Sequence, residues 1–172
     1  MQQQTSTITL YNYGVTTPRS YLLAAAFIVG NIVLPQLCHL MPQGGLILLP
    51  IYFFTLLGAY KYGLTVGLLT AVLSPLANNL LFGMPPAPML PIILIKSTIL
   101  AMSAALIARR TGRATLLGIV LAVITYQALG SLAEWGMTGS LAIAMQDISL
   151  GWPGILLQVL GCYLLLRYPL RK

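Results

Sequence analysis

The sequence predicts an all-α integral membrane protein with six transmembrane helices and both termini in the cytoplasm. Composition is the first reason: 58% of the 172 residues are hydrophobic and 6% are charged, whereas soluble proteins carry about 25% charged residues. The second reason is a series of six apolar segments, and the third is the alternation of basic residues between them. So few charges cannot cover a soluble globule, and disordered chains are polar, so both classes are excluded.

Six segments are long enough, or nearly so, to cross a bilayer, which takes about 17–25 apolar residues. In chain order they are residues 21–38, 46–60, 63–82, 89–108, 116–133 and 152–168. The second contains Pro50 and, like the sixth, is short, so the ends of these two are the least well defined. Arg19 before the first segment is typical of a signal peptide, but the segment is longer than a signal-peptide core and no small-residue cleavage site follows. We therefore expect a retained helix.

The basic residues predict the orientation, because Lys and Arg concentrate in cytoplasmic loops. The loops of one side contain His39, Glu134 and Asp147 but no Lys or Arg. With six crossings, eight basic residues fall on the other side: Arg19, Lys61, Arg109, Arg110, Arg113, Arg167, Arg171 and Lys172. Five or seven crossings would scatter these charges over both faces.

This orientation divides the chain into a cytoplasmic segment 1–20, a membrane domain 21–168 and a basic cytoplasmic tail 169–172. The net charge of +7 is then a consequence of topology. Nucleic-acid binding is therefore not expected.

Polar side chains concentrate in the outer half of the predicted helices, whereas the inner half offers little beyond arginines. Lys or Asp at the centre of a membrane helix costs about 2.5–3.5 kcal/mol, so such residues are functional candidates by default. The distribution predicts a substrate pocket open to the outside and not a pore through the whole bilayer. Its candidate residues are His39, Asn78, Asn79, Lys96, Tyr126, Gln127, Glu134 and Trp135.

Each candidate also has a structural interpretation. Lys96 could extend its ammonium to the outer headgroups, bind a carboxylate of the ligand, or pair with Glu134. Asp147 fits a solvated acid outside the site. Asn78 and Asn79 could cap a helix, and Gln127 could form an interhelical hydrogen bond. His39 and Trp135 could lie at the membrane interface.

The loop at residues 83–91 contains four prolines and no charge. Proline restricts its own backbone and that of the preceding residue, so we expect an extended, stiff segment. Such a segment could form a wall or a lid over the outer pocket, or it could be a rigid turn and nothing more.

Small residues at four-residue spacing let helices approach closely. Such pairs occur at Ala26 and Gly30, at Gly63 and Gly67, and at Ala101 and Ala105. Most such pairs serve packing inside a bundle. A pair exposed on a lipid-facing helix would instead form a docking surface.

The sequence lacks the motifs of known catalytic sites. One histidine and two acids cannot supply an HExxH zinc site, and neither a GxSxG elbow nor a GxxxxGK[ST] phosphate loop occurs. We therefore expect no enzyme activity, cofactor or metal site in this chain. Active transport would need energy from a partner or an ion gradient. Ion-coupled carriers usually hold acids near mid-membrane, and neither Glu134 nor Asp147 is expected there.

The segments LPIYFFTLLGAYKYG (residues 49–63) and SPLANNLLFGMP (residues 74–85), with Gly67 between them, resemble the substrate-binding S components of energy-coupling factor (ECF) transporters. The resemblance covers roughly residues 21–167. It implies a six-helix bundle in a bacterial or archaeal cytoplasmic membrane, with a pocket for a vitamin or related micronutrient on the extracytoplasmic side.

The resemblance also implies partners, namely a transmembrane coupling subunit and two cytoplasmic ATPases that topple the S component to deliver its ligand. Ala26 and Gly30 match the Ala-xxx-Ala pair that the family presents to the coupling subunit, with glycine in place of the second alanine. Members that bind cobalt or nickel use an N-terminal histidine, which this chain lacks, so a metal substrate is not expected. The alternative is a stand-alone carrier or channel for a small solute.

Overall fold

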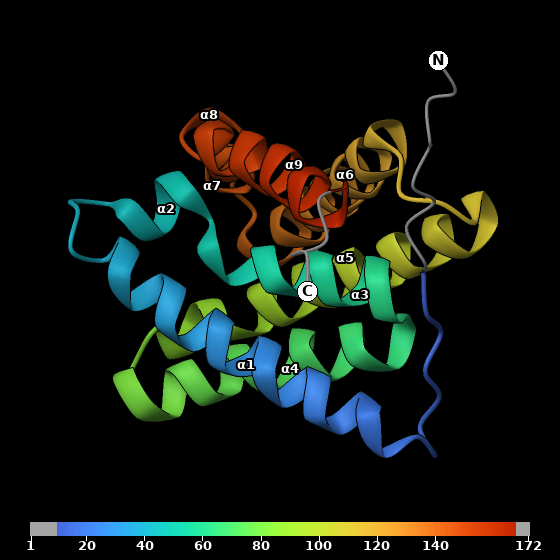
Figure 1. The fold of residues 1–172 in the computed structure, drawn as a ribbon. Coiled ribbons are helices and arrows are strands. Elements are labelled where there is room, and N and C mark those ends of the chain that lie inside the picture. Colours follow the sequence, from blue (N-terminus) through green and yellow to red (C-terminus); the bar gives the residue numbers. More distant parts are fainter. Residues whose placement is uncertain (1–9, 168–172) are drawn as a thin grey trace.

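The computed structural model describes residues 10–167, which fold into a bundle of helices (Figure 1). The all-α class predicted from the sequence is confirmed. Residues 1–9 of the predicted N-terminal segment, residue 168 of the predicted membrane domain and the whole predicted tail 169–172 lie outside the described residues. The elements are α1 (Pro18–Cys38), α2 (Gly44–Leu48), η1 (Pro50–Tyr52), α3 (Phe53–Tyr62), α4 (Leu64–Phe82), η2 (Ala87–Met89), α5 (Leu90–Thr111), α6 (Leu116–Thr138), α7 (Leu141–Ala144), α8 (Gln146–Ser149) and α9 (Trp152–Arg167).

Four helices in the described part are long and apolar enough to cross a membrane: α1, α4, α5 extended by η2, and α6. The helix α9 is apolar but shorter, with 16 residues. The single second helix expected over residues 46–60 is instead divided into α2, η1 and α3. The division falls at Leu49, which adopts the left-handed conformation with φ 46°. Pro50, which has no backbone N–H to donate, follows it.

Apart from Lys96, the basic residues of the described chain gather at one end of the bundle, which we call the basic end. There the N-terminal segment meets the α3–α4 turn, where the Tyr11 amide donates to the Lys61 carbonyl (2.8 Å). The α5–α6 turn lies at the same end, because the Tyr60 hydroxyl donates to the Arg113 carbonyl (3.4 Å). The opposite end consists of the last turn of α1, α2, the loop before η2, and α8 (Figure 1). We call it the pocket end.

Small residues pack α3, α4 and α5 tightly together in the half of the bundle nearer the basic end. A Cβ at Gly67 would lie 2.8 Å from the Ala59 Cα and 3.3 Å from the Ala101 Cβ. Ala59 and Ala101 are fully buried, and Ala105 is almost so. Gly67, Ala101 and Ala105 therefore serve packing inside the bundle. Gly63 instead forms the α3–α4 turn with φ 97° and faces Asn12 of the N-terminal segment.

The third small-residue pair, on α1, is divided between two faces. Ala26 is exposed, whereas a Cβ at Gly30 would lie 2.8 Å from the Phe54 ring. Gly30 therefore faces α3 across a close contact. Ala26 lies within a stripe of exposed apolar side chains on the outer face of α1, formed with Leu22, Val29, Val33 and Leu37.

A polar cluster joins α1, α3 and α4 inside the bundle. Asn31 donates from Nδ2 to the hydroxyls of Thr55 (3.0 Å) and Ser74 (3.1 Å), and its Oδ1 accepts from the Phe54 amide (3.2 Å). All three side chains are fully buried. The cluster satisfies their polar groups internally, as a low-dielectric interior requires, and it fixes how the three helices face one another.

Candidate functional site

The pocket end contains a cavity of about 310 Å³, which lies within the range of small-molecule sites. It opens between the last turn of α1, α2, the start of α5 and α8. Its walls are mostly apolar, with a few amides and one imidazole. The lining residues are Pro35, His39, Gln43, Gly45, Leu46, Pro50, Ile51, Asn78, Met84, Pro85, Pro86, Met89, Ile93 and Gln146.

The proline-rich loop forms one wall of this cavity through Met84, Pro85, Pro86 and Met89. Of the roles left open for this loop, the wall is the one that the structure contains. The loop is not extended throughout, because Ala87–Met89 forms the 3-10 helix η2. Asn79 fixes the loop to the end of α4 because its Nδ2 donates to the Pro85 carbonyl (2.7 Å). Asn79 thus acts on the cavity through the loop and does not line it.

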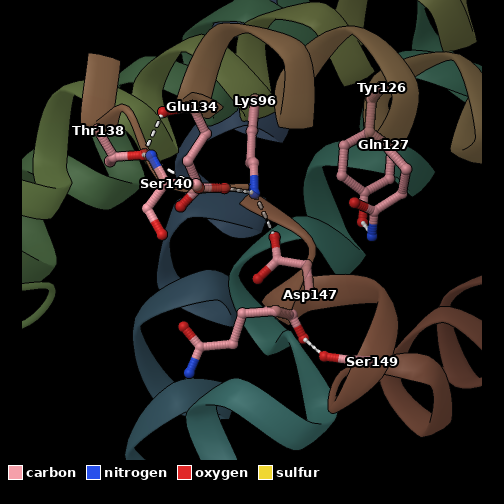
Figure 2. A network of polar contacts seen from close by, with 9 residues as sticks. Lys96, Tyr126, Gln127, Glu134, Thr138, Ser140, Asp147 and Ser149 are labelled. Carbon is pink, nitrogen blue, oxygen red and sulfur yellow. Dashed lines mark hydrogen bonds and ion pairs between the residues drawn. The ribbon is translucent and has the colours of Figure 1, made fainter. Parts of the chain in front are cut away.

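A buried ion-pair triad lies beside the cavity (Figure 2). Lys96 of α5 contacts Glu134 Oε2 of α6 at 2.5 Å and Asp147 Oδ2 of α8 at 2.7 Å. The Lys96 side chain is 2% exposed and the two carboxylates 9% and 14%. Glu134 and Asp147 are the two acidic residues of the whole sequence. Pairing with Glu134, one of the interpretations left open for Lys96, is therefore what the structure contains.

Two glycines of α6 allow the triad to form. A Cβ at Gly130 would lie 2.6 Å from the Lys96 Cγ, so glycine lets the lysine side chain cross α6. Glu134 follows one turn later on the same face. Gly139 ends α6 with φ 66°, a conformation that glycine adopts without steric cost. The chain reverses there, and α7 and α8 carry Asp147 back toward Lys96.

A second cavity of about 90 Å³ adjoins the triad. Lys96, Glu134 and Asp147 line it together with Tyr52 and Ile92. Six residues line both cavities, which makes the two cavities neighbours: Gly45, Leu46, Ile51, Met89, Ile93 and Gln146. A molecule in the larger cavity can therefore extend a group toward the triad.

Tyr126 and Gln127 belong to a neighbouring hydrogen-bond chain that lines neither cavity. Gln127 Nε2 donates to the Tyr126 hydroxyl (3.1 Å), which donates to Gln158 Oε1 (3.1 Å). Gln158 Nε2 in turn donates to the carbonyl of Leu49 (3.3 Å). The chain links α6 and α9 to the break between α2 and η1. Tyr126 also packs on Tyr52, with ring centroids 5.3 Å apart, so it supports the wall of the smaller cavity.

The remaining predicted site residues divide between the cavity and the surface. Asn78 lines the larger cavity at 2% exposure, and its Nδ2 donates to the Asn31 carbonyl (2.8 Å). His39 lines the same cavity from the end of α1. Trp135 is 46% exposed and lines neither cavity, although it directly follows Glu134.

Sequence reasoning missed Asp147, Gln146 and Gly130 as parts of the site. One signal was available for Asp147. The outer half contains a single lysine and the chain has only two acids, so pairing of both acids with that lysine could have been expected. Gln146 and Gly130 carried no such signal. Among the described residues, no three His, Cys, Asp or Glu side chains lie close enough to hold a metal ion.

Comparison of the chain with protein-family models, with curated proteins and with solved structures finds no match. What the fold and the site define is a helical protein with four candidate membrane-spanning helices and a pocket at one end of the bundle.

Proposed function

We propose that this chain is a membrane-embedded substrate-binding subunit that captures a small solute from outside the cell. The observation that carries the proposal is the cavity of about 310 Å³ at the end of the bundle opposite the basic end. Positively charged loops face the cytoplasm, so this cavity opens outward. The basic end also has a hollow, of about 360 Å³, which lies at the surface beside the N-terminal segment and includes two cations. Its lining residues are Tyr11, Tyr13, Arg19, Leu22, Leu23, Lys61 and Tyr62. The interior near Gly67 is tightly packed.

The proposal includes six crossings. They are α1, the segment 44–62 that contains α2, η1 and α3, then α4, α5, α6 and α9. Successive segments run between the two ends of the bundle (Figure 1). The segment 44–62 is interrupted, which leaves some backbone groups without helical hydrogen-bond partners. Neighbouring helices shield these groups from lipid, because α2 and α3 pack against α9, and α3 also packs against α4 and α5. Broken helices are tolerated at membrane depth where protein buries them.

The resemblance to S components of ECF transporters gives this subunit a role in ATP-driven uptake of a vitamin or related micronutrient. The exposed apolar stripe around Ala26 on α1 suits contact with a coupling subunit, because a small side chain lets helices approach closely. ATP hydrolysis then belongs to partner subunits. This chain binds and presents the solute but does no chemistry on it.

A thermal-shift screen of the purified protein against water-soluble vitamins and their precursors tests the proposal. We expect one compound to raise the melting temperature, and the shift to disappear in Asn78→Ala, which alters the cavity wall. The matched control is Thr125→Ala, because Thr125 is half-buried on α6, lines neither cavity and bonds only within its own helix. A shift that no cavity substitution reduces would place the binding site elsewhere.

Docking through α1 is tested separately by Ala26→Trp. A bulky indole in the exposed stripe should abolish co-purification with a coupling subunit while ligand binding persists. Val15→Trp, a change at another exposed position before α1, serves as the control. Retained association of Ala26→Trp would remove α1 from the interface.

The alternative is a stand-alone carrier, and one observation favours it. Ionisable groups buried in a membrane bundle are typical of ion-coupled pathways, and the Lys96 triad is such a group. Liposomes that contain only this chain distinguish the two functions. A binding subunit should retain ligand without net uptake, whereas a carrier should concentrate it when an ion gradient is applied.

A further inference from the structure

The charges at the pocket end do not balance. Lys96 contributes one positive charge to the triad, and Glu134 and Asp147 contribute two negative charges, so the formal sum is −1. Among the described residues that line the two cavities, Lys96 is the sole lysine or arginine. The triad is therefore one positive charge short of neutrality, and a buried charge without a partner is costly.

The triad also leaves acceptor atoms unused. Lys96 contacts one oxygen of each acid, Glu134 Oε2 and Asp147 Oδ2. Among the hydrogen bonds of the described residues, none involves Glu134 Oε1 or Asp147 Oδ1. An ionised carboxylate accepts through both oxygens. Both residues line the smaller cavity, so hydrogen-bonding capacity remains next to a space that a ligand group can enter.

The wall of the larger cavity also contains an acceptor atom without a donor. Asn78 lines that cavity and is 2% exposed. Its Nδ2 is engaged, but its Oδ1 has no hydrogen-bond partner among the described residues. A buried amide oxygen without a donor costs about 1–3 kcal/mol in proteins. This oxygen has almost no accessible surface, so it lies within the cavity wall, and an occupant would reach it only if the Asn78 side chain moved.

We propose that the pocket binds a small cation. Its uncharged body occupies the larger cavity, while a positively charged nitrogen enters the smaller cavity and donates to Glu134 and Asp147. The inference rests on the proposed function, because it names the substrate class of that pocket. It reverses the sequence-based interpretation in which Lys96 binds a carboxylate of the ligand. Lys96 is already neutralised, and an anion would add to a negative charge that is in excess.

Sets of three compounds with one skeleton and three charges test the proposal on the purified full-length protein. One set is 1-methylnicotinamide, nicotinamide and nicotinic acid, which are a cation, a neutral molecule and an anion. A second set is benzylamine, benzyl alcohol and benzoate. Binding is measured by thermal shift and by calorimetry at fixed pH and ionic strength. We expect only the cationic members to bind.

Asp147→Asn is the diagnostic variant, because it brings the formal charge of the triad to zero with little change in shape. We expect it to weaken binding of the best cation on the order of a hundredfold, as loss of a buried charge partner does. The melting temperature of the empty protein should stay the same or rise. Ser149→Ala, an exposed change two residues along α8, should alter neither measurement.

Three outcomes would overturn the cation proposal in different ways. Neutral or anionic members that bind as tightly as the cation would refute it and leave the proposed binding function standing. Absence of binding by every member, together with absence of a hit among water-soluble vitamins, would refute both. If Asp147→Asn is as unstable as Lys96→Met, then Asp147 stabilises the fold and its negative charge is not available to bind a ligand.

Discussion

The two ends of the bundle use the same apolar composition for opposite purposes. In the half nearer the basic end, α3 and α4 approach closely inside the bundle, with Gly67 against Ala59, and the hollow at that end lies at the surface beside the N-terminal segment. At the pocket end the helices separate around a cavity, and the interior holds Lys96, Glu134 and Asp147. The comparison shows that hydrophobicity alone does not locate function in such a chain. The functional region is instead located by the size of the side chains at helix contacts and by the few places where charge is buried.

The largest effect should come from removing the positive charge of the triad. Lys96→Met leaves two acids facing each other, and losing one partner of a buried ion pair costs about 3–5 kcal/mol. The melting temperature should fall steeply, and ligand binding should be lost. Lys61→Met at the basic end is the matched control, because Lys61 contacts the face of the Tyr62 ring and such contacts contribute about 0.5–1 kcal/mol at exposed sites.

A rescue experiment sharpens this prediction. Glu134→Gln and Asp147→Asn, added to Lys96→Met, remove both uncompensated charges and should restore much of the lost stability. Binding should remain absent. If the triple variant is no more stable than Lys96→Met alone, the loss arises from packing and not from charge.

The second prediction concerns the close contact near the basic end. Gly67→Ala places a methyl group 2.8 Å from the Ala59 Cα, and overpacking of this kind costs about 1–3 kcal/mol. The protein that remains folded should bind ligand with unchanged affinity, because the contact is remote from the cavity. A denaturation midpoint and a binding isotherm on the same sample check both parts. A large change in affinity would show that the two ends are coupled.

The third prediction returns to the pocket end and has a control on the same helix. Gly130→Ala brings a methyl group to 2.6 Å from the Lys96 Cγ, which displaces the lysine from its acids. Because a flexible side chain can move aside, the expected cost in stability is nearer the lower limit of about 1–3 kcal/mol, with weaker ligand binding. A Cβ at Gly136 meets nothing within 4 Å. Gly136→Ala should therefore leave binding intact and stabilise α6 by up to about 1 kcal/mol.

The smallest effect should come from the proline-rich loop. Asn79→Ala removes the hydrogen bond to the Pro85 carbonyl, and one such bond contributes about 1 kcal/mol. Ligand dissociation should accelerate by about fivefold, with little change in melting temperature. Stopped-flow measurement of the dissociation rate checks this, with Thr125→Ala as the variant that loses a comparable bond away from the cavity. Equal acceleration in both variants would show that the proline-rich loop does not control ligand dissociation.

The long helices and the one-sided basic residues could be predicted because both depend on local sequence. Hydropathy places α1, α4, α5 and α6 within a few residues of their observed ends. The break at Leu49 could not be predicted in the same way, because a leucine with φ 46° is held there by its surroundings and not by its own preference. Sequence placed Asp147 in solvent, whereas the chain reversal at Gly139 brings it to Lys96.

Part of the candidate site was also accessible from sequence. Lys96, Glu134, Asn78 and His39 stood out as polar residues in or beside apolar segments, and all four line the cavities. The same reasoning also selected Trp135, which is exposed, because it cannot tell which face of a helix turns inward. That choice depends on tertiary packing.

The claim that a pocket faces the outside and the basic end faces the cytoplasm is tested most directly by labelling intact cells. Cys38 and Cys162, both buried, are replaced by alanine, and a single cysteine is introduced as Gln146→Cys in the cavity wall or as Arg110→Cys at the basic end. A membrane-impermeant maleimide should label the first in intact cells and the second only after permeabilisation. Labelling of Arg110→Cys but not Gln146→Cys in intact cells would contradict the account.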